Sequence, residues 1–81
     1  MKVPRDLSGA ELAKALSKMG YRQTRQSGSH IRLSRPSSDG DHHITVPDHS
    51  PIKVGTLSAV LRDVATRLKM SRSDLMEKLF G

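Results

Sequence analysis

The chain of 81 residues contains no cysteine, and Tyr21 and Phe80 are its only tyrosine, phenylalanine or tryptophan residues. Without cysteine, neither disulfide bonds nor thiolate metal sites can support the fold, so packing and hydrogen bonds must hold it together. Without several rings, base stacking is not available as a route to sequence-specific binding of single strands. Any nucleic-acid contacts would therefore be made with phosphate and ribose, and we expect a weak sequence preference.

Long apolar runs are also missing. Charged residues interrupt the first twenty positions, namely Lys2, Arg5, Asp6, Glu11, Lys14 and Lys18. We therefore expect no signal peptide, no membrane span and a cytoplasmic location. A chain of this length fits one small domain with a modest core, which we expect to span residues 1–81.

Acidic residues are scarce in the first part of the chain. Residues 1–35 hold eight lysines and arginines against two acids, whereas residues 36–81 hold six of each, so the net charge of +6 comes from the first 35 residues. Residues 21–35 contain four arginines and no acid: Arg22, Arg25, Arg32 and Arg35. Such a patch indicates an anionic partner, and guanidinium groups suit bidentate phosphate contacts. Charge alone does not separate nucleic acid from an acidic protein or from a solubilising surface.

A helix start is recognisable near the beginning of the chain. Ser8 and Glu11 have the spacing of a capping box, and Leu7 and Leu12 occupy the positions of a hydrophobic staple. Apolar residues then recur at helical spacing until Gly20, a residue type that commonly follows the end of a helix. The spacing predicts a helix over residues 9–19.

Three strands are predicted next. Residues 21–26 and a run starting at His30 form a predicted hairpin around Gly28, and the "HHITV" segment at residues 42–46 resumes the alternation. The period of two predicts one apolar inner face, made of Ile31, Leu33, Ile44 and Val46. It predicts an outer face exposed to water, made of His30, Arg32, Ser34, His43 and Thr45.

The strongest periodic signal follows two prolines. One helical stripe contains Leu57, Val60, Leu61, Val64 and Leu68. Ser71 and Asp74 repeat the capping pattern before a short final helix with Leu75, Met76, Leu79 and Phe80. The order α-β-β-β-α-α predicts an α+β fold, with a three-stranded antiparallel sheet whose inner face is covered by the first two helices.

Three segments in this order resemble the HicA toxins of bacterial and archaeal toxin–antitoxin modules: "GYRQTRQSGSHIRL", "ITVPDHSPIKVGTL" and "LRDVATRLKMSRSDLMEKLF". The similarity runs from about Leu7 to Phe80, and its glycine–serine–histidine element is the most specific part. The resemblance implies a fold similar to the double-stranded RNA-binding domain and an mRNA-cleaving activity. It also implies a catalytic histidine matching His30 and neutralisation by a HicB antitoxin.

The chemistry of an imidazole is consistent with this role for His30. Cleavage of RNA without a metal or other cofactor requires the ribose 2′-hydroxyl to lose its proton, and an imidazole, with an ordinary pKa of roughly 6.5, suits that task. Nearby positive charge would stabilise the transition state; the candidates are Arg32, Arg25, Arg22 and Lys53. Gly28 would allow close approach of the backbone, and Ser29 could orient a phosphate oxygen. His43 is a candidate for a general acid.

Other interpretations compete with this one. His42, His43 and His49 lie near Asp39, Asp41 and Asp48, which are ligand types for zinc. Adjacent residues of a strand point to opposite faces, so this spacing is poor and we expect no metal site. Two other functions stay open: a non-catalytic RNA-binding module, and a protein-interaction partner of an acidic antitoxin.

Overall fold

Within residues 6–81, three helices and three strands follow one another in the predicted order. The computed structural model describes residues 6–81. The elements are α1 (Gly9–Ser17), β1 (Arg22–Ser27), β2 (His30–Arg35), β3 (His42–Pro47), α2 (Val54–Leu68) and α3 (Arg72–Phe80). The α+β class is therefore confirmed. The predicted domain also includes residues 1–5, which lie outside the described part of the chain.

Helix α1 begins as predicted and ends earlier. The Ser8 amide donates to Glu11 Oε1 over 2.9 Å, and the Glu11 amide donates to Ser8 Oγ over 3.0 Å, so the capping box is formed. The helix ends at Ser17 because the next two amides bond to carbonyls three residues back, which tightens the last turn. Gly20 then takes a positive φ of 95°, as expected after a helix.

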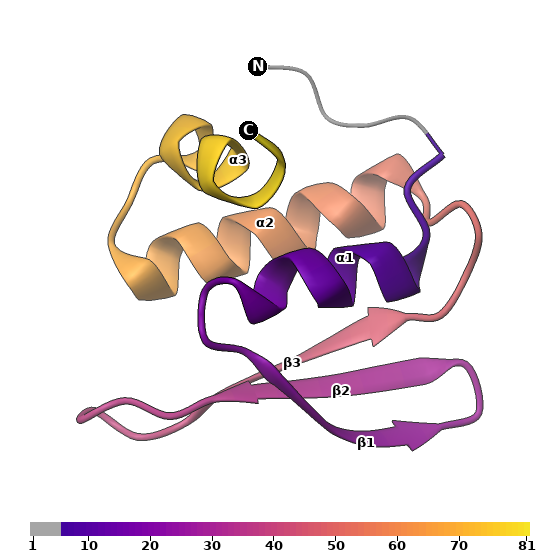
Figure 1. Ribbon diagram of the computed structural model, residues 1–81, viewed down its shortest axis with the longest axis horizontal. Helices are drawn as coiled ribbons and strands as arrows, with labels where there is room; N and C mark the ends of the chain where they lie inside the picture. Colours follow the sequence, from indigo (N-terminus) through magenta and orange to yellow (C-terminus); the bar gives the residue numbers. More distant parts are fainter. Residues whose placement is uncertain (1–5) are drawn as a thin grey trace.

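The strands form one antiparallel sheet in the order β1-β2-β3, and the helices lie on one side of it (Figure 1). Helix α1 packs against all three strands, and α2 packs against β3. Helix α3 packs against α1 and α2, on the side away from the sheet. The prediction that the first two helices cover the sheet is thus confirmed, with α3 as an additional layer.

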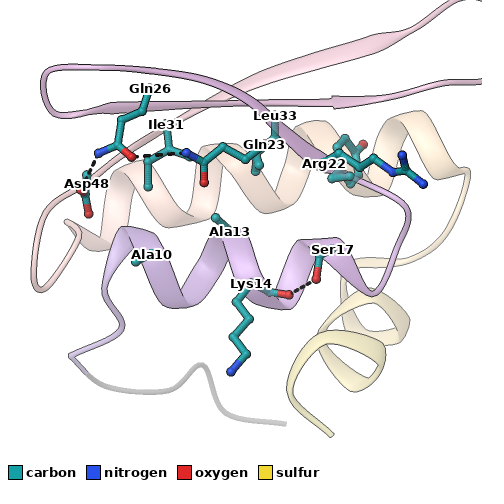
Figure 2. Close-up of a pocket in the computed structure, with 11 residues that line it drawn as sticks. Ala10, Ala13, Lys14, Ser17, Arg22, Gln23, Gln26, Ile31, Leu33 and Asp48 are labelled. Atoms are coloured by element: carbon teal, nitrogen blue, oxygen red, sulfur yellow. Dashed lines mark hydrogen bonds between the residues drawn. The ribbon is translucent and has the colours of Figure 1, made fainter.

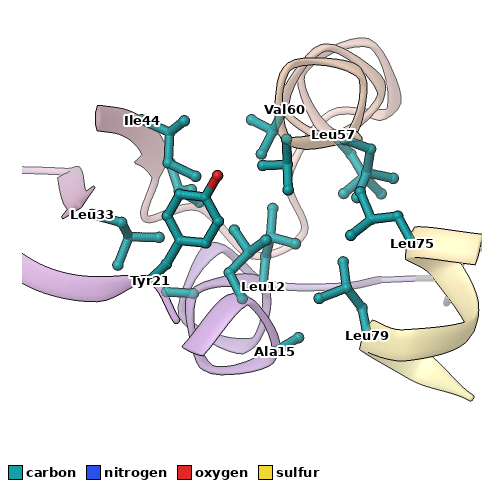
Figure 3. Close-up of a cluster of buried hydrophobic side chains, with 14 of the residues drawn as sticks. Leu12, Ala15, Tyr21, Leu33, Ile44, Leu57, Val60, Leu75 and Leu79 are labelled. Atoms are coloured by element: carbon teal, nitrogen blue, oxygen red, sulfur yellow. The ribbon is translucent and has the colours of Figure 1, made fainter. Parts of the chain in front are cut away.

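The core lies between the sheet and the helices (Figure 3). All four predicted inner-face residues are buried: Ile31, Leu33, Ile44 and Val46. Leu12 of α1, Leu57 of α2 and Leu79 of α3 belong to the same cluster, so one core joins every layer. None of the three helices within residues 6–81 covers the outer face of the sheet (Figure 1).

The loop between β3 and α2 is bonded to two other parts of the chain. Its first amide, from Asp48, donates to the carbonyl of Ser29 over 2.6 Å. The Gly9 amide donates to the carbonyl of His49 over 2.9 Å. A Cβ atom at Gly9 would lie 1.9 Å from the Pro47 carbonyl oxygen, so only glycine permits this approach. These contacts fix the end of the sheet where β2 begins.

Candidate nucleic-acid interface

The outer face of the sheet is polar, as the alternation predicts. His30, Arg32, His43 and Thr45 are all exposed. Ser34 differs from the expectation, since only 9% of its surface is exposed. It lies on the central strand, and its Oγ is 2.6 Å from Nδ1 of His43, so the imidazole of the neighbouring strand covers it.

His30 lies in a hollow of about 280 Å³ on this face. The hollow is lined by Arg25, Ser27, His30, Arg32 and Thr45. The strand register explains the grouping, because Ser27 is opposite His30 and both Arg25 and Thr45 are opposite Arg32. The lining therefore combines one imidazole, two guanidinium groups and two hydroxyls, and it includes no carboxylate.

A β-bulge in β1 gives Arg25 its position. Gln23 pairs with Leu33 and faces the helices, and in a regular strand Arg25 would share that face. The register shifts between these two residues, which leaves Thr24 as the extra residue and pairs Arg25 with Arg32. The bulge thereby moves one guanidinium group to the side of the sheet that carries His30.

The two arginines of the hollow are available to a ligand. Among residues 6–81, the one ion pair within 4.0 Å joins His42 and Asp63. Neither Arg25 nor Arg32 donates a side-chain hydrogen bond within that range, whereas Arg35 donates through Nε to the Met19 carbonyl over 2.7 Å. Arg35 is thus engaged in the fold, and the other two arginines present free donors to the surface.

The remaining predicted site residues occupy different places. Gly28 lies in the β1–β2 turn with φ of 58°, and open space surrounds the position of an added Cβ. Ser29 is exposed beside it. Lys53 is exposed at the N-cap of α2 and is not part of the hollow lining. The turn residues are therefore adjacent to His30, and Lys53 is not brought to it.

Arg22 pairs with Ser34 at the far end of β2 from His30, and it also borders a second concave region. A groove of about 420 Å³ runs between α1 and β1, and Arg22 lines it together with Gln23 and Gln26 (Figure 2). The facing side of α1 contributes Ala10, Ala13, Lys14 and Ser17. The structure therefore places Arg25 and Arg32 at His30 and places Arg22 elsewhere.

The neighbouring histidines of β3 have separate partners. Nδ1 of His42 is 2.6 Å from the Tyr21 hydroxyl, and its Nε2 is 3.2 Å from Oδ1 of Asp63. Burial raises the pKa of the Tyr21 phenol, and its hydroxyl shares this short hydrogen bond with Nδ1 of His42. The described residues contain no group of three His, Cys, Asp or Glu side chains that could hold a metal ion. His42 thus faces the helices, and His43 faces the opposite side.

Sequence reasoning missed Ser27 as a neighbour of His30. The predicted first strand ends at residue 26, whereas β1 extends to Ser27. The length of the turn could have revealed this neighbour. A two-residue hairpin loop at Gly28 and Ser29 pairs the residues on either side of it, which are Ser27 and His30.

The sequence that forms this fold and its cationic face also matches a known protein family. Residues 9–65 match the family model described as "HicA toxin of bacterial toxin-antitoxin". The match covers both faces of the sheet and most of α2, which is well over half of the chain. The chain belongs to the HicA toxin family. No curated protein and no solved structure shows a significant match to it.

Membership of this family supports a toxin role in a toxin–antitoxin module. HicA toxins are generally ribonucleases, and the family implies a HicB-type antitoxin as partner. Across the part of the chain that the structure describes, every helix is too short or too polar to cross a membrane.

Proposed function

We propose that this chain is an endoribonuclease toxin that cleaves mRNA without a metal ion and uses His30 as its general base. One observation supports this proposal above the others. The exposed imidazole of His30 shares a hollow with the unpaired guanidinium groups of Arg25 and Arg32 on the uncovered face of the sheet. A phosphodiester is the substrate group that such a lining suits, because guanidinium binds phosphate bidentately.

The proposed reaction is an internal transesterification. His30 takes the proton of the ribose 2′-hydroxyl, and the 2′-oxygen forms a bond to the adjacent phosphorus as the bond from phosphorus to the 5′-oxygen breaks. The leaving 5′-oxygen takes a proton from water, and the hydroxide formed is neutralised by the proton that His30 releases. The products are a 2′,3′-cyclic phosphate and a free 5′-hydroxyl. Arg25 and Arg32 stabilise the negative charge that develops on the phosphate oxygens.

The set of catalytic groups around His30 supports a slow enzyme. His43 is paired opposite Ser34, four residues along β2 from His30. At the rise of a β-strand this separation is roughly 13 Å, which is too far for both imidazoles to act on one phosphate. A single positioned base contributes roughly 10²- to 10⁴-fold to the rate. We infer that the toxin cleaves with one base and solvent as the acid.

The same face suits the antitoxin. A HicB-type chain that places acidic side chains against Arg25 and Arg32 would occupy the hollow of His30. Inhibition then follows from competition, since substrate and antitoxin need the same guanidinium groups.

The test uses purified wild-type protein, His30→Ala and His49→Ala, each incubated with mixed RNA in EDTA. His49 is an exposed histidine that is not part of the hollow lining, so its replacement is a matched control. We expect wild type and His49→Ala to cleave at similar rates and to leave cyclic phosphate and 5′-hydroxyl ends. We expect His30→Ala to lose at least about 100-fold in rate while its folded state is retained.

Full activity of His30→Ala would overturn the assignment of the base. Products with 5′-phosphate ends, or loss of wild-type cleavage in EDTA, would indicate an activated water and a metal-dependent reaction instead.

A further inference from the structure

A second hollow of about 520 Å³ lies beside that of His30 on the same face of the sheet. It is lined by Thr24, Arg25, Arg32, Ser34, Asp41 and His43. Arg25 and Arg32 thus belong to both hollows, with one imidazole on either side of the arginine pair. The uncovered face therefore has two adjoining cationic recesses.

His43 is held in a defined orientation in the second hollow. Its Nδ1 is 2.6 Å from Oγ of Ser34, and Ser34 is a buried residue of the central strand. Nε2 of His43 has no hydrogen-bond partner among residues 6–81, so one ring nitrogen is fixed and the other is available. A ring held in this way loses little side-chain entropy when it binds a ligand.

The spacing of the two hollows suits a polymer. The roughly 13 Å between the two histidine positions along the sheet excludes action on one phosphate group. It is compatible with two different phosphates of one strand, both contacted by the shared arginines. Thr24, the extra residue of the bulge, borders this hollow, and its hydroxyl donates to the Arg32 carbonyl over 3.4 Å.

We propose that the His43 hollow is a second phosphate-binding subsite, which holds another phosphodiester of the RNA strand that is cleaved at His30. The proposal rests on the proposed function, because it orients the same substrate. His43 donates through Nε2, and Arg25 and Arg32 bridge the two phosphates. Asp41 is the one carboxylate of this lining and repels the phosphate, which makes its replacement informative.

The experiment locates the subsite with neutral linkages. The substrate is a 2′-O-methyl RNA strand with a single ribonucleotide, so that one bond only can be cleaved, and one flanking phosphodiester at a time is replaced by an uncharged methylphosphonate. We expect wild-type cleavage to fall about tenfold at one flanking linkage, the effect of losing one charged hydrogen bond. In His43→Ala, cleavage of the unmodified strand falls by about the same factor, and that linkage becomes less sensitive to neutralisation, because only the arginines still contact its phosphate.

Two further variants guard against a trivial loss of folding. His43→Gln keeps an amide that can bond to Ser34, and we expect an intermediate rate. Asp41→Asn removes the repulsion, and we expect tighter binding of the unmodified strand. His49→Ala is the control and keeps the wild-type pattern.

The same strands without the ribonucleotide cannot be cleaved, and their binding, measured by fluorescence anisotropy, separates the two proposals. A linkage effect on binding without any cleavage of the first substrate would support the subsite and reject the nuclease. Identical linkage profiles for wild type and His43→Ala would overturn the subsite. Loss of antitoxin binding in His43→Ala with unchanged RNA binding would also overturn it, in favour of a protein contact.

Discussion

Arg32 and Leu33 are neighbours in β2, yet they belong to two faces of the sheet with opposite properties. Leu33 is 1% exposed and packs beneath the helices, whereas Arg32 is exposed and lines both cationic hollows. One face carries the apolar area whose burial drives folding, and the other carries guanidinium groups that have no hydrogen-bond partner among residues 6–81. A six-residue strand thus separates stability from recognition by alternation alone.

The adjacent histidines of β3 show the same difference between the two faces of the sheet, here with a single residue type. His42 bonds to Tyr21 and Asp63 and joins the sheet to α2. His43 bonds to Ser34 on the outer face and leaves a ring nitrogen to solvent. Identical side chains therefore serve the fold or the surface according to the parity of their position.

The largest expected effect comes from truncating the buried one of the two neighbours in β2. Leu33→Ala leaves a cavity in the core and should lower the free energy of unfolding by about 2–5 kcal/mol. Arg32→Ala should change it by no more than about 0.5 kcal/mol, because the side chain lies on the surface. Urea denaturation of both variants measures this. Equal destabilisation by the two changes would show that the faces are not separated in this way.

A smaller effect is expected from the two histidines of β3. His42→Ala leaves the buried Tyr21 hydroxyl without its partner, which should cost about 1–3 kcal/mol in unfolding free energy. His43→Ala should cost less than about 1 kcal/mol, because water can reach the outer face and bond to Ser34. Adding Tyr21→Phe to His42→Ala removes the unpaired hydroxyl and should recover part of the loss. A greater loss for His43→Ala in the same unfolding experiment would contradict the comparison.

The smallest effect concerns the helical layer and depends on pH. The Ser8 amide, and then the Ser8 side chain, lower the pKa of Glu11 below its ordinary value of 4.5. The unfolded state therefore takes up a proton first as pH falls. The stability that this carboxylate contributes is full above pH 4.5 and is lost as pH falls through the lower folded-state value.

Glu11→Gln isolates this contribution. Wild type should be slightly more stable than the variant at neutral pH, and the difference should shrink below pH 4.5. The measurement is the unfolding free energy of both proteins across this range. A difference that is constant with pH would show that the capping carboxylate does not titrate in this manner.

The sequence was sufficient to predict those features that depend on local periodicity. The capping box of α1, the buried face with Leu33 and the helical stripe with Leu61 all follow from spacing along a single segment. The position of Arg25 could not be derived in this way, because the bulge that turns it outward reflects pairing with another strand. The hydrogen bonds of His42 with Tyr21 and with Asp63 also join three distant segments and have no local pattern.

The candidate site was predictable to a similar extent. Alternation and family resemblance together pointed to His30 and Arg32 on an exposed face, and the structure places both there. The pairing of β2 with β3 was needed to show that His43 and His30 are too far apart to act on one phosphate. The register between two strands cannot be derived from the sequence of either strand alone.

The bonds of the β3–α2 loop have a consequence for the end of the sheet that carries His30. The residue before His30, Ser29, accepts from Asp48, and the next residue of the loop, His49, accepts from the first residue of α1, Gly9. The hairpin tip is thus tethered through main-chain atoms to the amino end of a helix on the opposite side of the sheet. A change that displaces the start of α1 therefore shifts the position of the His30 ring, and it does so without altering any side chain on the outer face of the sheet.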